Sequence, residues 1–212
     1  MPRAVLWIIG GPNGAGKTTL ATHARFQRLL QDVRFLNPDQ LALERLRTGG
    51  RQGFHDATPE ELRLCFIESA ETVERGLRAA LTRCEPIGVE SVLSTRKYCP
   101  LVEQTLAVGG FFGFIYVGLK SPEISRQRVA QRVSTGGHDV PVEKLAARWI
   151  RSIENLGWFS IRASRLWVLD NSDSTLGVPP RLIAEGRAGV VRILDPEAIP
   201  EITRSLAEAR SA

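Results

Sequence analysis

The sequence has little cysteine, little lysine and no long apolar run. Its three cysteines, Cys65, Cys84 and Cys99, are odd in number, and no two stand at metal-ligand spacing. This pattern argues against a disulfide framework and favours a reducing compartment, so we expect a cytoplasmic protein with a buried free thiol at Cys65. The first apolar run, residues 4–9, is too short to span a membrane and leads directly into glycines. It therefore indicates a strand rather than a signal peptide or a membrane span.

Basic charge comes mostly from arginine. Lysine and arginine together number 28 against 23 acidic residues, which gives a formal net charge of +5 and a pI of about 9.6. This balance favours a polyanionic ligand such as a nucleotide, a sugar nucleotide or a nucleic acid, although a solvated basic surface explains it equally well. Hydrophobic residues make up 43% and charged residues 24% of the 212 residues, which is ordinary for one globular domain.

Strand-like and helix-like segments alternate along the chain. Apolar runs predict strands at residues 5–9, 33–36, 87–92, 111–119 and 166–169. Spacing and caps predict helices at residues 15–30, 40–47, 58–83, 101–108, 122–133 and 141–156, then a C-terminal hairpin at 181–194 and a helix at 196–210. We therefore expect a single α/β domain over residues 1–212, a P-loop fold whose mostly parallel, doubly wound sheet carries helices on both faces.

The first strand leads into a phosphate-binding motif. Eight consecutive residues fit G-x-x-x-x-G-K-[ST], namely Gly11, Pro12, Asn13, Gly14, Ala15, Gly16, Lys17 and Thr18. The glycines let backbone N–H groups point at phosphate, Lys17 reaches the β- and γ-phosphates, and Thr18 holds Mg²⁺, with Thr19 beside it. A glycine-rich turn with an exposed lysine would show the same letters. The strand before it and the helix after it favour nucleotide binding.

Two acids are predicted at the carboxyl ends of strands, where doubly wound sheets bind ligands. Asp39 follows the second strand on a predicted loop and is our candidate for the base that accepts the proton of an attacking hydroxyl. Its alternative role is to cap the helix that begins at Gln40. Glu90 lies in the third strand, where a buried unpaired charge would be costly. It could instead be a partly exposed strand residue.

Arginines gather in the predicted lid, residues 121–156. Arg128 and Arg132 share one helix face, and the next helix carries Arg148 and Arg151, with Ser152 and Asn155 predicted beside Arg148. Arginines on two helices joined by a glycine-rich loop suit a lid that stabilises charge on a transferred phosphoryl group. A solvated basic face is the alternative explanation. The guanine-reading N-K-x-D pattern and the L-S-G-G-Q signature of transporter ATPases are both absent from the sequence.

Several motifs in this order resemble the zeta-toxin family of small P-loop kinases, and more closely its compact bacterial branch. Besides the phosphate loop, they are Leu36-Asn37-Pro38-Asp39, Val89-Glu90-Ser91-Val92-Leu93-Ser94, Ser121-Pro122-Glu123, Arg128-Val129, Arg132-Val133, Gly136-Gly137-His138-Asp139-Val140-Pro141, Arg148, Arg151-Ser152, Asn155-Leu156 and Asp170-Asn171-Ser172. The resemblance extends over nearly the whole chain, and its most specific part runs from residue 121 to 156.

The resemblance implies transfer of phosphate from ATP, with Mg²⁺, to a hydroxyl. In the family the acceptor is UDP-N-acetylglucosamine, and the kinase is the toxin of a toxin–antitoxin pair. By the same resemblance Asp39 matches the catalytic base, Arg132 supports the γ-phosphate and Glu90 lies in the substrate pocket. Lys17 and Thr18 carry over directly. We group Arg128 with the catalytic residues, and we group Ser94, Arg148 and Arg151 with Glu90 as substrate-binding residues.

The sequence departs from the toxins in the lid, where His138 stands near the position of a further phosphate-stabilising arginine. Arg148 or Arg151 could replace that arginine. The acceptor stays open between a sugar nucleotide and another metabolite or an antibiotic. A polynucleotide-modifying protein is a third hypothesis, but the sequence lacks the aromatic–basic pattern of single-strand binders. A non-catalytic ATP switch is a fourth. An antitoxin partner would be a separate chain.

Overall fold

A computed structural model describes residues 3–21, 24–134, 140–175 and 178–211. The strands are β1 (Val5–Gly10), β2 (Arg34–Leu36), β3 (Ile87–Ser91), β4 (Phe111–Gly118), β5 (Arg165–Asp170), β6 (Arg181–Arg187) and β7 (Val190–Ile193). The helices are α1 (Lys17–Ala21), α2 (Ala24–Leu30), α3 (Pro38–Thr48), the short 3-10 helix η1 (Phe54–Asp56), α4 (Pro59–Thr82), α5 (Cys99–Ala107), α6 (Pro122–Ser134), α7 (Val142–Ser160) and α8 (Pro200–Ser211).

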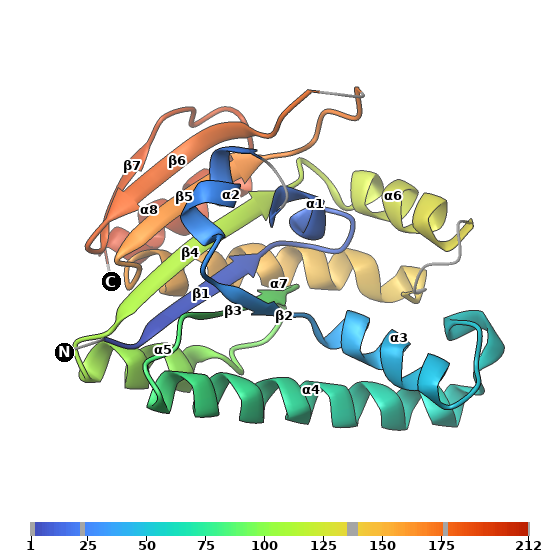
Figure 1. Cartoon of the computed structure of the whole chain (residues 1–212). Helices are drawn as coiled ribbons and strands as arrows, with labels where there is room; N and C mark the ends of the chain where they lie inside the picture. The colour runs from blue at the N-terminus through green and yellow to red at the C-terminus, as the bar shows by residue number, and fades with distance from the viewer. Residues whose placement is uncertain (1–2, 22–23, 135–139, 176–177, 212) are drawn as a thin grey trace.

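The seven strands form one sheet in the order β2-β3-β1-β4-β5-β6-β7. The first five strands along the sheet pair in parallel, and β6 and β7 extend it as an antiparallel hairpin. This arrangement confirms the predicted α/β fold with a mostly parallel sheet. Because the parallel strands run in one direction, their carboxyl ends lie together at one edge, where α1, α3 and α6 also begin (Figure 1).

Helices cover both faces of the sheet (Figure 1). Helices α1 and α2 lie on one face, and α4, α5, α7 and α8 lie on the other. On the α7 face, Phe112, Phe114 and Phe159 pack ring against ring and are fully buried. On the α2 face, Trp7 stacks on Trp167 with the ring centroids 6.0 Å apart. Aromatic rings from neighbouring strands therefore account for much of the core on both faces.

Two smaller hydrophobic clusters lie away from the main core. One joins α3 to the start of α4 and contains Ala42, Leu46, Phe54 and Cys65, so the thiol of Cys65 is buried as predicted. The other joins α6 to α7 and contains Val129, Val140 and Leu145. These clusters therefore add local packing between neighbouring helices, while α7 also contributes Trp149, Ile153 and Leu156 to the main core. Among the described helices, none combines the length and the apolar character needed to cross a bilayer.

The predicted helix ends agree with the observed ones at some positions and differ at others. The predicted capping box at Thr58 is present, and α4 begins at the next residue. The helix predicted over 196–210 begins only at Pro200, whose fixed φ suits the first helical position. The predicted helix 15–30 is described as α1 and α2, and residues 22–23 between them lie outside the described residues.

Candidate active site

The phosphate loop joins β1 to α1 at the carboxyl edge of the sheet. Its conformation depends on glycine, because Gly11 (φ 144°) and Gly16 (φ 83°) adopt dihedrals that side chains rarely allow. A Cβ atom at Gly11 would stand 2.2 Å from the carbonyl oxygen of Val117, and one at Gly16 would stand 2.7 Å from Nδ2 of Asn171. The sequence motif therefore corresponds to a backbone that packs closely against β4 and the segment after β5.

The ammonium group of Lys17 folds back onto this loop. Its Nζ donates hydrogen bonds to the carbonyl oxygens of Gly11 at 2.8 Å and of Pro12 at 2.9 Å. Loss of water around the buried ammonium lowers the pKa of Lys17 to about 8, against the opposing effect of the nearby carboxylates of Glu90 and Asp39. The ammonium is therefore held by hydrogen bonds to two neutral carbonyl groups. An anion in the loop would be a better partner.

Glu90 receives two hydrogen bonds from polar side chains. Its Oε2 accepts from Oγ1 of Thr18 at 2.9 Å and from Nδ2 of Asn37 at 3.2 Å. Burial raises the pKa of Glu90, while the bond from Thr18 and the charge of Lys17 act in the opposite direction. Glu90 lies at the end of β3, beside β1, so the sheet brings this acid next to the hydroxyl predicted to hold Mg²⁺.

Asp39 is in a different place from either prediction. It lies in the first turn of α3, not on a loop, and it does not cap that helix. The cap is Asn37, whose Oδ1 accepts from the backbone N–H groups of Asp39 at 3.0 Å and Gln40 at 3.4 Å. The carboxylate of Asp39 is exposed and close enough to Lys17 to favour its charged form. Since Asn37 takes the capping role, the Asp39 carboxylate stays available for chemistry.

Three side chains from outside the loop fix the phosphate loop from one side. Oγ of Ser125 in α6 donates to the carbonyl oxygen of Asn13 at 2.6 Å. Nδ2 of Asn171, in the segment after β5, donates to the carbonyl oxygen of Ala15 at 2.8 Å. We predicted no role for Ser125, and Asn171 appeared only within a motif. A polar residue directly after a buried strand was the one available signal for Asn171.

Arg128 is the third of these side chains, and it donates mainly to backbone carbonyls. Nη1 donates to the carbonyl oxygens of Asn171 at 2.7 Å and Gly14 at 3.4 Å. Nη2 donates to the carbonyl oxygen of Asp173 at 2.8 Å and to the hydroxyl of Ser174 at 3.2 Å. Burial lowers the pKa of this guanidinium. These contacts support a positioning role for Arg128, which joins α6, the phosphate loop and the segment after β5.

The other lid arginines are spread over two helices. Arg132, in the last turn of α6, is exposed, and its positive charge contributes to the lowered pKa of Lys17. Arg148 is half-buried and Arg151 is exposed on α7. Ser152 and Asn155 do not share the accessible surface with them, because both side chains point inward and are buried. His138 lies outside the described residues.

The remaining predicted residues lie near the loop or after β3. Thr18 and Thr19 are exposed at the start of α1, and Ser94 is half-buried in the segment that follows β3. Among the described residues, no group of three or more His, Cys, Asp or Glu side chains gathers as a metal site made by protein alone. Mg²⁺ commonly uses one or two protein ligands together with phosphate oxygens, so Thr18 and Glu90 fit such a site.

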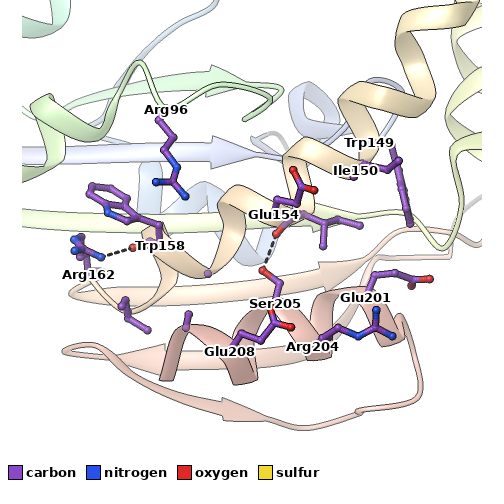
Figure 2. Close-up of a pocket in the computed structure, with 14 residues that line it drawn as sticks. Arg96, Trp149, Ile150, Glu154, Trp158, Arg162, Glu201, Arg204, Ser205 and Glu208 are labelled. Carbon is purple, nitrogen blue, oxygen red and sulfur yellow. Dashed lines mark hydrogen bonds between the residues drawn. The ribbon is translucent and has the colours of Figure 1, made fainter. Parts of the chain in front are cut away.

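A cavity of about 680 Å³ lies elsewhere, between α7 and α8. Figure 2 shows its lining, with Trp158, Arg162 and Arg96 toward one end and Trp149 and Glu201 toward the other. None of its lining residues belongs to the phosphate loop. The chemistry predicted from the sequence is therefore gathered at the sheet edge and not in this cavity.

Comparison with known proteins identifies the fold. No protein-family model matches the sequence, and no curated protein matches it. The structure resembles a chain of the AvrRxo1-ORF1:ORF2 complex crystallised with ATP, with a TM-score of 0.73 and 16% identity over 95% of this chain and 64% of that one. The present chain thus spans less than two thirds of that protein's length.

Two further solved structures have the same general architecture. A putative kinase from Chloroflexus aurantiacus gives a TM-score of 0.55 at 17% identity, over 70% of this chain and 78% of that one. A chain of the PezAT toxin–antitoxin system of Streptococcus pneumoniae gives 0.52 at 14% identity, over 100% and 89%. At these identities the likeness concerns the fold alone, and it shows that this chain shares the α/β fold of these proteins.

Proposed function

We propose that the protein transfers the terminal phosphate of ATP to a hydroxyl group of a small molecule. One observation carries the proposal: the phosphate loop, the acid Glu90 and the exposed acid Asp39 meet at one edge of the sheet. The charges of both acids act on the ammonium of Lys17, which places all three groups in one electrostatic environment. Transfer of a phosphoryl group to a hydroxyl requires a loop that holds the phosphates of ATP and, beside it, an exposed carboxylate that can accept the hydroxyl proton.

The residues of the phosphate loop are suited to bind ATP, the proposed phosphoryl donor. The glycines of the loop leave no side chain between the backbone and a phosphate, and the ammonium of Lys17 donates to two carbonyl oxygens of the loop. On binding, Lys17 exchanges these two carbonyls for phosphate oxygens, which are stronger partners for a cation. Ser125, Arg128 and Asn171 already fix the loop, so little reorganisation is needed.

Thr18 and Glu90 are suited to hold Mg²⁺. The Thr18 hydroxyl donates its hydrogen to Glu90, which leaves lone pairs of the same oxygen for a cation. Glu90 also accepts from Asn37, so its carboxylate is fixed in direction. When bound, Mg²⁺ supplies charge neutralisation at the β- and γ-phosphates. In this assignment Glu90 serves the metal site as well as the substrate pocket in which the family resemblance placed it.

Asp39 is proposed as the base that orients the acceptor hydroxyl and takes its proton. It is exposed, it lies in the first turn of α3, and it does not cap the helix. Arg132 is proposed to stabilise charge on the transferred group, because its charge already acts on Lys17. Arg148 and Arg151 on α7 are proposed to complete the lid around the substrate.

We propose a sugar nucleotide such as UDP-N-acetylglucosamine as the acceptor. The support is the set of motifs shared with zeta toxins, together with the basic residues in the lid. The test is incubation with ATP and Mg²⁺ and a panel of sugar nucleotides, nucleosides and antibiotics, followed by mass spectrometry. A mass increase of one phosphate on UDP-N-acetylglucosamine is expected. Phosphorylation of a different hydroxyl compound would replace this acceptor, and failure to modify any compound would remove the proposed activity.

A protein partner is a further part of the proposal. Two structures of similar fold come from pairs of proteins, namely the AvrRxo1-ORF1:ORF2 complex and the PezAT toxin–antitoxin system. We therefore propose that this kinase acts as a toxin with its own antitoxin. Expression of the chain alone should inhibit growth of a bacterial host, and the Asp39→Asn variant should not. Equal growth with both forms would contradict a toxic role.

A further inference from the structure

Helix α7 is attached to the sheet by a row of three buried polar groups at spacings of three residues. Trp149 Nε1 donates to the carbonyl oxygen of Leu119 at 2.9 Å, and Ser152 Oγ lies 3.0 Å from the hydroxyl of Tyr116. Asn155 Nδ2 donates to the carbonyl oxygen of Leu93 at 2.8 Å. The first two bonds reach β4 and the residue after it. The third is different, because it reaches the segment that follows Glu90.

That segment has an unusual backbone at Leu93. Its φ is 61°, in the left-handed region that non-glycine residues rarely adopt, and its side chain is 1% exposed. Such a conformation costs about 1–3 kcal/mol and persists only where surrounding contacts maintain it. Ser91 Oγ accepts from the backbone N–H of Leu93 at 3.0 Å, and Asn155 binds the carbonyl on the other side. Both polar backbone groups of Leu93 therefore have a side-chain partner.

Asn155 also contacts the far end of the same segment. Nε of Arg96 donates to Oδ1 of Asn155 at 3.1 Å, and Figure 2 shows Arg96 extending toward α7. One buried carboxamide thus bridges Leu93 and Arg96, and the two residues between them include Ser94. The bridged turn thus contains Ser94 and begins three residues after Glu90, and both residues were predicted from the sequence to bind the substrate.

We propose that Asn155 is a positioning residue that fixes the 93–96 turn relative to α7. The inference rests on the proposed function, in which Glu90 borders the substrate and Arg148 and Arg151 on α7 complete the lid, and on the prediction from the sequence that Ser94 binds the substrate. Because a helix is stiff over the two turns that separate Arg148 from Asn155, the same bond sets the distance between the lid arginines and the acceptor turn. Asn155 therefore controls use of the acceptor and not binding of the nucleotide.

The first test measures the turn itself, without any acceptor. In Asn155→Ala, backbone amides of residues 93–99 should exchange hydrogen at least about tenfold faster than in the wild type, because the left-handed turn loses its partner. The matched control is Ser152→Ala, which removes a buried polar group from the same helix one turn earlier. The control should leave exchange at 93–99 unchanged. Unchanged exchange in Asn155→Ala, or equal acceleration in both variants, would overturn the inference.

The second test separates acceptor from nucleotide. For transfer to UDP-N-acetylglucosamine, Asn155→Ala should lower kcat/KM for the acceptor by about 10- to 100-fold, while the Kd of a fluorescent ATP analogue changes by less than about twofold. Ser152→Ala should change neither by more than about twofold. A parallel loss of ATP-analogue binding in Asn155→Ala would contradict a role confined to the acceptor turn.

A third variant distinguishes the two hydrogen bonds of the Asn155 carboxamide, one to the Leu93 carbonyl and one from Arg96. Asn155→Asp keeps an acceptor for Arg96 but places a carboxylate against the carbonyl of Leu93, and it should accelerate exchange as much as Asn155→Ala. Full protection of residues 93–99 in Asn155→Asp would show that the bond to Leu93 is dispensable and would overturn the proposal. If wild-type protein phosphorylates no acceptor, the proposed function fails, and the exchange measurements still decide whether Asn155 positions the turn.

Discussion

The donor side and the acceptor side of the candidate site are built in different ways. The phosphate loop is fixed by its own glycines and by side chains from two other segments, Ser125 and Arg128 in α6 and Asn171 after β5. The acceptor side consists of the first turn of α3, with Asp39 exposed, and a turn after β3 that Asn155 bridges. The donor side is thus held by three side chains from two segments, whereas the acceptor side depends on fewer contacts.

This difference has a physical origin. Phosphate groups are the same in every nucleotide, so a loop that binds them can be rigid and local in sequence. An acceptor must be distinguished from other hydroxyl compounds, which requires side chains from several segments. On this side α3 and the start of α4 pack through their own small cluster, while the later part of α4 packs into the main core through Val73, Leu77 and Ala80. We expect substitutions on the two sides to affect different steps.

The largest effect is expected from loss of the Lys17 ammonium. Lys17→Met keeps an unbranched side chain in the half-buried position but removes the cation, so the donor phosphates lose their charged partner. We expect transfer to fall by at least about a hundredfold, with weaker ATP binding, because one preorganised charge-stabilising donor is worth about that much. Lys144→Met, an exposed lysine in the first turn of α7, is the control and should transfer at the wild-type rate. Retained activity in Lys17→Met would remove Lys17 from the donor site.

The second largest effect is expected from Asp39→Asn, which changes the acceptor side of the site. The amide cannot accept the hydroxyl proton, so kcat should fall by about 10²-fold, the lower end of the usual contribution of a positioned base. ATP binding, measured by calorimetry, should stay within about twofold, because the exposed Asp39 carboxylate acts on Lys17 only through its charge. Glu44→Gln, farther along the same helix, is the control. A large loss of ATP affinity with unchanged kcat would reverse the assignment.

Arg128→Ala should show how much the bracing of the donor side contributes. Removing the guanidinium leaves backbone oxygens of Gly14, Asn171 and Asp173 without a donor. We expect a loss of about 1–3 kcal/mol in the free energy of unfolding and roughly tenfold weaker ATP binding. Thermal melts with and without ATP measure both. Arg126→Ala, exposed two residues earlier on α6, should match the wild type, and equal losses in the two variants would contradict a positioning role.

The smallest effect is expected from pH. The pKa of Lys17 is lowered to about 8 by burial, so in the free protein the ammonium loses its proton as pH rises through that value. Only the charged form pairs with phosphate. ATP affinity should therefore be constant below pH 8 and should weaken by up to about tenfold per pH unit above it. Calorimetric titrations from pH 6.5 to 8.5 measure this, and Lys17→Met should flatten the profile. A wild-type affinity independent of pH would show that Lys17 does not titrate there.

Sequence patterns predicted the fold and the glycine-dependent turn between β1 and α1, because both depend on local chemistry. An apolar strand, a glycine-rich turn and a helix in succession are visible in consecutive residues, and alternating elements imply a parallel sheet. The helix ends were less well predicted. The start of α3 shows the reason, since both Asn37 and Asp39 can cap a helix, and only the observed backbone assigns the cap to Asn37.

The same limit applies to side-chain direction. Periodicity placed Ser152 and Asn155 beside the lid arginines, because a helical pattern shows which residues share a face but not what lies against that face. In the structure both are buried against β4 and the segment after β3. Arg128 is a similar case: its type indicated phosphate chemistry, but its neighbours are carbonyl groups from segments more than 40 residues away in sequence.

The sequence by itself determined that this chain folds as a P-loop α/β domain, because glycine dihedrals, apolar runs and helix caps act over a few residues. Only the tertiary structure decided that Glu90 bonds to Thr18, that Arg128 braces the loop and that Asn155 bridges the turn after β3. These contacts join residues that are 62 to 114 positions apart in the chain. Their partners are set by how the sheet orders its strands, and strand order depends on packing of the whole core rather than on any local pattern.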